Sequence, residues 1–205
     1  MYPPPYYTNN NRDFLKKVIK KHSFAFMTTA HEGGILGTHL PFVFEESYEN
    51  HCALYGHVAV NNPQVKHIEA AAPALITFNG PHAYISASWY DKPEKNVPTW
   101  DYISVQAKGI LTLLPKDQWL GEMQKLTQAY EGDAGWQMSQ AHDYVEALMR
   151  GIVYFKMEIN SLQGVEKMSQ NKSHSEKLTI ISELRAREER DTADAIADAM
   201  KTDKI

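Results

Sequence analysis

A run of alternating apolar and polar residues at positions 102–114 is the feature that most restricts the fold of this chain. Its apolar members recur at every second position, so they share one face of an extended strand: Ile103, Val105, Ala107, Leu111 and Leu113. Pro115 follows the run and opens a helical pattern. The pattern predicts one long strand with a single face in a core.

Shorter apolar runs recur along the chain and are separated by turn residues. They predict further strands at 23–30, 35–44, 53–58, 74–78, 83–89 and 152–159. Pro41 lies inside the second of these runs, and we place an edge of the sheet or a bulge there. Six or seven strands with few long helices predict an α+β fold built on a closed or split antiparallel barrel rather than βαβ units.

Helical patterns flank the strands. Asn61, Asn62 and Pro63 form a helix start signal, whose backbone N–H groups and positive dipole end we expect to be free for an anion. Further helices are expected after residues 9–11, after the strand at 102–114, at 141–150 and in the tail. We expect a barrel domain over 1–175 and a helical tail over 176–205 that packs on the barrel or on a dimer partner.

Charge and cysteine content exclude several classes of protein. The chain has 205 residues and a formal net charge of −4, which argues against a broad basic footprint for nucleic acid. Cys52 is the only cysteine, so no intramolecular disulfide can form. The N-terminus lacks the pattern of a signal peptide, and no apolar run approaches the roughly 20 residues that span a bilayer. These features predict a soluble cytoplasmic protein with no membrane partner.

Sequence signatures of several catalytic classes are absent. The chain contains no HExxH, CxxC, GxSxG, P-loop or GxGxxG motif. We therefore predict no metal site and identify no catalytic residue. His39, His57 and His82 leave one alternative open, a haem-handling protein in which a histidine ligates iron.

Five segments combine polar and apolar residues at the ends of predicted strands: 38–42, 56–64, 80–90, 97–102 and 167–172. Each segment alone is compatible with a barrel strand that has a polar outer face. Together they supply apolar and aromatic walls, a few aimed hydrogen-bonding groups and cations. A buried planar heterocycle with a phosphate tail requires this mixture.

The same segments carry a family resemblance. The chain contains MYPPPYY, THLPF, GHVAVNNPQ, GPHAYISASWY, VPTWDY and KMSQNK in this order over about residues 1–180. It resembles the PaiB family, FMN-binding negative transcriptional regulators with the split β-barrel of pyridoxamine-phosphate-oxidase-like flavoproteins. The resemblance implies a homodimer with FMN at the subunit interface and repression of genes for degradative enzymes and sporulation.

The resemblance also implies a set of cofactor-binding residues. Three would line one wall of the flavin site: Thr38, His39 and Leu40. Three would lie at the phosphate end: His57, Asn61 and Asn62. The ring or ribityl chain would be faced by Tyr84, Ser86 and Ser88, with Trp89 and Trp100 as walls. The expected set also includes Thr99. The pocket would be closed by Lys167, Ser169, Gln170, Asn171 and Lys172, with Lys167 near the N1–C2=O edge as a tuner of redox potential.

Three positions depart from the family pattern. Val60 stands where the family has an arginine, which removes a charge-assisted phosphate contact of roughly 1.5–3 kcal/mol. Lys172 replaces a final arginine and keeps the charge without the bidentate fork. Asp101 replaces an asparagine and adds a negative charge near the expected site.

Three functions remain open at this point: a transcriptional regulator, a flavin-dependent oxidoreductase acting on a small molecule, and a haem-binding protein. The tail at 175–200 is the one candidate for a DNA-reading element. Its arginines are diluted by Glu183, Glu188, Glu189 and Asp191. We therefore expect weak DNA binding or none.

Overall fold

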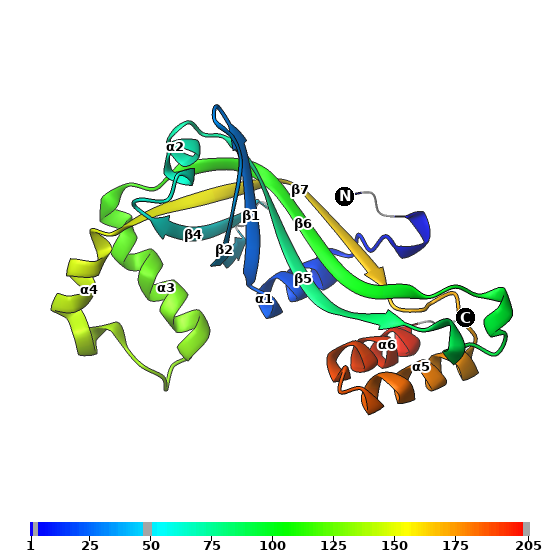
Figure 1. The fold of residues 1–205 in the computed structure, drawn as a ribbon. Helices are drawn as coiled ribbons and strands as arrows, with labels where there is room; N and C mark the ends of the chain where they lie inside the picture. Colours follow the sequence, from blue (N-terminus) through cyan, green and yellow to red (C-terminus); the bar gives the residue numbers. More distant parts are fainter. Residues whose placement is uncertain (2–3, 47–50, 203–205) are drawn as a thin grey trace. The chain divides into compact units, whose positions relative to one another are not determined.

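The computed structural model describes residues 1, 4–46 and 51–202. Its strands form one seven-stranded sheet in the order β2-β1-β5-β6-β7-β4-β3 (Figure 1). The strands are β1 (Phe24–His31), β2 (Gly34–Pro41), β3 (Val43–Glu46), β4 (Cys52–Ala59), β5 (Pro73–Ile85), β6 (Thr99–Leu113) and β7 (Ile152–Lys167). The pairs β1–β2, β1–β5, β3–β4 and β4–β7 are antiparallel. The predicted α+β class is confirmed.

The two edge strands of this sheet are almost continuous in the chain. Only Phe42 separates β2 from β3, although these strands lie at opposite ends of the strand order. A sheet whose edges are joined this closely must curl on itself. Gly56 of β4 allows the approach, because a Cβ there would lie only 3.1 Å from Leu40 Cδ1. The fold is the predicted split β-barrel, and Pro41 ends an edge strand as expected.

Two strand predictions need correction. The runs at 74–78 and 83–89 are not separate strands, because β5 continues through residues 79–82 to Ile85. Gly80 and Pro81 suggest a turn in the sequence. In the structure a Cβ on Gly80 would lie 3.0 Å from the Cβ of Ile103, so glycine serves a close approach between strands. The end of the strand predicted at 83–89 is instead a 3-10 turn, Ala87–Trp89.

Two further strand predictions, at 35–44 and 152–159, also need correction. The run at 35–44 divides at Phe42 into β2 and β3. The last strand does not end at 159 but continues to Lys167. Residues 160–163 are mostly polar and only partly buried, so the apolar alternation that predicts a strand is lost there.

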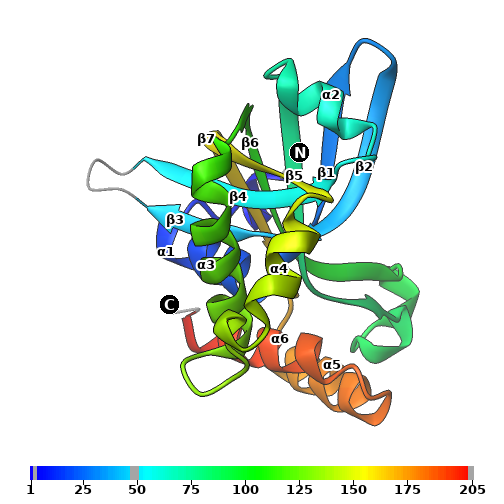
Figure 2. The same cartoon turned by 90° about the vertical axis from the view of Figure 1, so that its left-hand side faces the viewer.

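Six α-helices accompany the sheet in the described ranges: α1 (Arg12–Lys21), α2 (Gln64–Glu69), α3 (Trp119–Glu131), α4 (His142–Met149), α5 (His174–Ala186) and α6 (Arg190–Thr202). The helices α3 and α4 lie side by side, and so do α5 and α6 (Figures 1 and 2). Among these helices, none has the length and apolar character needed to cross a membrane.

The chain divides into two compact units, and β5, β6 and β7 each run from one into the other. The barrel unit comprises residues 12–78 and 106–162, and the tail unit comprises residues 1–11, 79–105 and 163–205. The expected packing of the helical tail on the barrel or on a partner stays a prediction.

Aromatic and aliphatic side chains fill the barrel unit. Phe42 packs edge to face on Phe78 and Phe155, with ring centroids 6.0 and 6.3 Å apart. The helix α1 adds the buried residues Leu15 and Ile19 to this core and leaves its lysines on the outer face. The alternation of buried residues along β1 and β4 follows the period of two that predicts them.

The tail unit is organised around α5. A capping box begins this helix, because the Ser173 hydroxyl accepts from Glu176 N–H and the Glu176 carboxylate accepts from Ser173 N–H. Ile180 and Leu184 on its inner face are fully buried. The helix thereby fixes where the loop after β7 ends.

Candidate functional site

A pocket of about 500 Å³ in the tail unit gathers residues from three stretches of the chain, and we call it the Lys167 pocket. Its lining residues are Tyr7, Tyr90, Glu94, Lys95, Asn96, Val97, Thr99, Asp101, Lys167, Ser169, Asn171 and Lys172. Five of these belong to the predicted cofactor-binding set: Thr99, Lys167, Ser169, Asn171 and Lys172. The fold therefore brings together two motifs that are far apart in sequence.

Asp101 is the buried acid of this pocket, with 1% of its surface exposed. The Ser169 hydroxyl donates to its Oδ2 at 2.5 Å, and the Lys167 ammonium lies 3.9 Å from its Oδ1. Burial raises the pKa of Asp101 to about 6, although the Ser169 hydrogen bond and the nearby lysines lower it. The pocket thus holds a carboxyl group that changes charge near pH 6.

Ser169 occupies a left-handed backbone conformation with a φ of 55°, which is uncommon for a residue with a side chain. The turn around it is fixed by its own hydrogen bonds. Met168 N–H donates to the Gln170 side-chain oxygen at 2.8 Å, and Lys172 N–H donates to the Ser169 carbonyl at 3.0 Å. Backbone strain that is held in this way is concentrated at functional sites.

The Lys167 ammonium is held in one place by three groups. It donates to Thr99 Oγ1 at 2.5 Å and to the Trp100 carbonyl at 2.6 Å. The Tyr7 ring centroid lies 5.8 Å away, within the range of a cation–π contact. Burial lowers the pKa of Lys167, and the Asp101 carboxylate opposes this shift.

Lys172 supplies a second oriented cation. Its ammonium donates to Asn96 Oδ1 at 2.7 Å and lies 3.7 Å from the centroid of the Tyr90 ring. Burial, and then the Asp101 charge, raise the pKa of Tyr90 to about 12. The Tyr90 phenol therefore stays protonated at neutral pH and can donate a hydrogen bond.

Two predicted aromatic residues of the tail unit are exposed together. The rings of Tyr84 and Trp100 meet edge to face at 6.1 Å, and 44% and 55% of these residues are exposed. His82 lies against the same indole at 6.4 Å. This aromatic surface offers flat apolar area to a ring or to another protein surface.

The three remaining ring-side predictions are placed differently. The Ser86 and Ser88 hydroxyls hydrogen-bond to each other at 2.8 Å, and Ser86 caps the 3-10 turn. Trp89 is 6% exposed, with the Arg187 guanidinium 4.8 Å from its ring. Trp89 therefore belongs to the core of the tail unit, and its expected role as a pocket wall stays a prediction.

The predicted phosphate end falls in the barrel unit, where Thr38 and Asn62 are linked. The Asn62 amide donates to Thr38 Oγ1 at 3.1 Å, and its Oδ1 accepts from Gln64 N–H at 2.9 Å. The next amide, Val65 N–H, donates to the Asn62 carbonyl at 2.9 Å. The expectation of free N–H groups at this helix start is therefore wrong for these residues, since Asn62 already caps the turn.

The other barrel-unit predictions occupy mixed environments. His39 and Asn61 are exposed, whereas Leu40 is 4% exposed and belongs to the core. Within the described residues, His57 Nδ1 is buried without a hydrogen-bond partner, and its ring packs on Tyr154 at 4.9 Å. Burial lowers the pKa of His57, so the imidazole is neutral at physiological pH.

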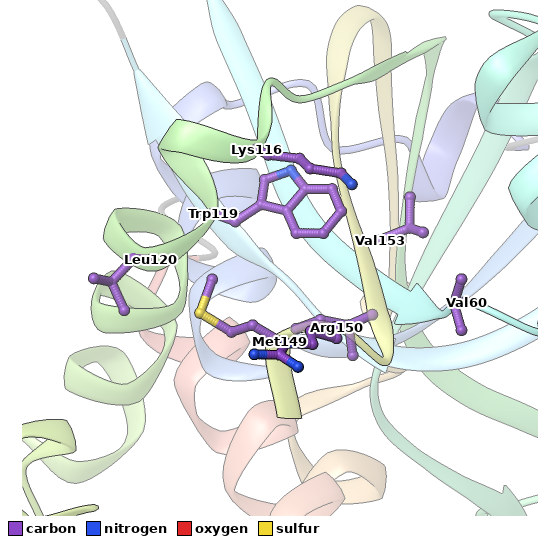
Figure 3. A pocket seen from close by; sticks show the side chains of 8 residues that line it. Val60, Lys116, Trp119, Leu120, Met149, Arg150 and Val153 are labelled. Carbon is purple, nitrogen blue, oxygen red and sulfur yellow. The ribbon is translucent and has the colours of Figure 1, made fainter. Parts of the chain in front are cut away.

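Val60 lines a second pocket in the barrel unit, which we call the Trp119 pocket (Figure 3). Its lining residues are Val60, Lys116, Trp119, Leu120, Met149, Arg150, Ile152 and Val153. Val60 is 47% exposed. Two cations, Lys116 and Arg150, thus share a pocket with Val60.

Sequence reasoning missed several residues that line the Lys167 pocket, among them Tyr7, Tyr90 and Asn96. Tyr7 and Tyr90 lie in motifs that carry the family resemblance, so the motif boundaries could have suggested them. Asn96 lies in a polar loop with no pattern of its own. As for metals, the described residues contain no cluster of three or more ligating side chains.

Comparison with known proteins adds a family and a fold. The family described as "Putative FMN-binding domain" matches residues 1–161. The chain is 34% identical over 209 residues to the "Protease synthase and sporulation protein PAI 2" of Bacillus subtilis (strain 168), a match that covers 100% of this chain and 98% of that protein.

Two solved structures share the fold at 12% sequence identity. The FAD and heme binding protein from Mycobacterium smegmatis has a TM-score of 0.59, with 78% of this chain and 73% of that chain covered. The flavocytochrome Anf3 from Azotobacter vinelandii has a TM-score of 0.59, with 79% and 70% covered. At this identity the likeness concerns the fold alone.

Proposed function

The chain belongs to the FMN-binding domain family, and we propose that it is a PaiB-type regulator that holds FMN, the family's cofactor, in the Lys167 pocket. One observation carries this choice of pocket. Lys167 bonds to Thr99, a residue 68 positions away, and the loop after Lys167 lines the same cavity. The two motifs that meet there are both part of the family resemblance.

The donor set of the pocket fits FMN. The flavin ring presents carbonyl oxygens and ring nitrogens, and its phosphate is an anion, so the site needs N–H donors and cations. Lys167, Lys172 and Asn171 supply such donors, and the rings of Tyr7 and Tyr90 add planar walls. These groups would hold the polar edge or the phosphate of the cofactor.

The pocket residues also determine the charge around the cofactor. Bound FMN supplies reversible transfer of a hydride or of single electrons. The Lys167 ammonium, fixed by Thr99, favours negative charge on any atom beside it. The Asp101 carboxylate partly offsets this positive field when it is ionised, and the offset decreases below about pH 6. Changes in pH would therefore alter how strongly a reduced, anionic flavin is stabilised.

The spectrum of protein purified without added cofactor tests this function. We expect flavin absorbance bands and the release of FMN on denaturation. A Soret band in place of the flavin bands would support the haem alternative and contradict the proposal. A colourless protein that also fails to bind added FMN would contradict it as well.

A second copy of the chain is the proposed partner at the flavin site. The exposed Tyr84 and Trp100 rings form an aromatic surface that a second copy would cover. Light scattering should report twice the mass of one chain. A monomer at micromolar concentration would remove the proposed interface.

Direct contact with DNA is proposed to be weak, and the protein is proposed to act in the cytoplasm. The formal net charge is −4, but α1 gathers four lysines on one face, a feature that sequence reasoning did not single out: Lys16, Lys17, Lys20 and Lys21. One of these, Lys16, is already paired with Glu46 at 2.6 Å. A gel shift at about 150 mM salt is expected to show little binding. Tight, sequence-selective binding would contradict this expectation and make α1 and the tail helices the elements to mutate.

A further inference from the structure

The Trp119 pocket plays no part in the proposed flavin site, and its chemistry differs from that of the Lys167 pocket. We propose that it binds a small organic carboxylate with an apolar body, a ligand distinct from FMN. The inference does not depend on the flavin assignment, because it uses other residues and a ligand without a flavin ring.

Apolar side chains form the walls of the pocket. Trp119 and Val153 are each 8% exposed, while Leu120, Met149 and Ile152 are partly exposed toward the cavity. Figure 3 shows the indole of Trp119 between Lys116 on one side and Met149 on the other. These walls offer an apolar ligand a surface from which water is easily displaced.

The indole is held rigidly before any ligand arrives. Trp119 Nε1 donates to the Leu114 carbonyl at 2.9 Å, and the ring packs on Tyr154 at 6.1 Å. Tyr154 is in turn 1% exposed and donates through its hydroxyl to Met123 Sδ at 3.2 Å. The pocket measures about 540 Å³, a size typical of preformed sites for small molecules.

Two cations border this apolar wall. Lys116 and Arg150 are both exposed, and the Lys116 ammonium lies 5.9 Å from the Trp119 ring. In the part of the chain that the structure describes, neither is paired with a carboxylate, and no acidic residue lines the pocket. Two unpaired cations beside an apolar wall favour an amphipathic anion.

The choice of an anionic head group follows from Arg150 and Lys116. A guanidinium presents parallel N–H donors that match a pair of anionic oxygens such as those of a carboxylate, and Lys116 adds a second charge. An inorganic anion would use the cations but leave the apolar wall uncovered. A neutral apolar molecule would cover the wall but leave the cations without a partner.

Calorimetric titration of the full chain with naphthalene-2-carboxylate tests the inference, with the neutral naphthalene-2-carboxamide as control ligand. We expect one acid molecule per chain and at least about tenfold weaker binding of the amide. Arg150→Gln and Lys116→Gln should each weaken the acid about tenfold. Lys66→Gln removes an exposed lysine of α2 in the same unit and should have no effect.

Several results would overturn the inference. One is equal affinity for the acid and the amide. Another is that Arg150→Gln and Lys116→Gln bind the acid as tightly as Lys66→Gln does. A third is displacement of the acid by saturating FMN. Thermal melting of each variant without ligand checks the fold. If Arg150→Gln melts early, Lys116→Gln decides the outcome, because Lys116 lies on an exposed turn.

Discussion

The Lys167 pocket and the Trp119 pocket each contain cationic side chains, but the protein holds these cations differently. Lys167 and Lys172 are bonded to Thr99 and Asn96, and the buried Asp101 lies beside them. Lys116 and Arg150 border an apolar wall and have no carboxylate beside them in the pocket lining. A fixed polar network suits a ligand with several polar atoms in set positions. A loose pair of cations over an apolar wall suits a simple amphipathic anion.

Asp101→Asn should produce the largest effect on stability. The pKa of Asp101 is about 6 in the folded chain against its ordinary 3.8, so the folded state binds this proton more tightly. The resulting stabilisation is complete below pH 3.8 and is lost as pH rises to about 6. Asparagine removes the buried charge, so the free energy of unfolding at pH 8 should rise by up to about 3 kcal/mol.

Urea denaturation at pH 4 and pH 8 measures this effect. The gain from Asp101→Asn should be present at pH 8 and nearly absent at pH 4. Lys116→Gln in the other pocket serves as the control and should show no such pH dependence. A gain of the same size at both pH values would mean that the charge of Asp101 is not the cause.

Ser169→Ala should weaken the same network. The substitution leaves Asp101 Oδ2 without its hydroxyl donor at 2.5 Å, and a hydrogen bond to a charged group contributes about 1.5–3 kcal/mol. Denaturation at pH 8 should show a loss of this size. Ser182→Ala, at an exposed residue of the same unit, is the matched control. Equal stability of the two variants would show that the bond to Asp101 contributes little.

Trp119→Phe tests the preformed wall of the second pocket. It removes the neutral hydrogen bond from Nε1 to the Leu114 carbonyl and part of the packing on Tyr154. The expected loss of stability is about 1–2 kcal/mol, smaller than for a charged bond. Binding of naphthalene-2-carboxylate should weaken in parallel. A variant with unchanged affinity would show that the indole does not contact the ligand.

Val60→Arg should have the smallest effect and separates two hypotheses for this position. Val60 is 47% exposed and lines the Trp119 pocket, so an added guanidinium can reach solvent there. We expect about three- to tenfold tighter binding of naphthalene-2-carboxylate. The ratio of FMN to riboflavin affinity should not change. A selective gain for FMN would support the phosphate site expected from sequence. It would contradict the proposal that the two pockets bind different ligands.

Much of the fold could be predicted because its signal is local. The alternation at 102–114 predicts β6, and Pro41 marks the edge strand β2. The continuity of β5 through Gly80 could not be predicted, because it depends on the neighbouring Ile103. The far end of β7 was missed because residues 160–163 are mostly polar and only partly buried, so the alternation is lost there.

The candidate site was predictable only as a set of motifs. The motif at 167–172 and Thr99 were expected at one site. Thr99 lines one cavity with Lys167, Ser169, Asn171 and Lys172, whereas Gln170 is not among its lining residues. The sequence shows Asp101 only as an added charge. Its burial, its hydrogen bond from Ser169 and its raised pKa follow from packing that no local sequence pattern encodes.

Equilibrium titration with FMN of apoprotein carrying Lys167→Gln tests whether FMN binds in the Lys167 pocket. Lys92→Gln, at an exposed lysine of the same unit, is the matched control, and Lys116→Gln reports on the second pocket. Lys167→Gln should weaken FMN binding about tenfold or more, while the other two variants should bind FMN as the unaltered protein does. Unchanged FMN affinity in Lys167→Gln, with the fold intact by thermal melting, would contradict the assignment of FMN to the Lys167 pocket.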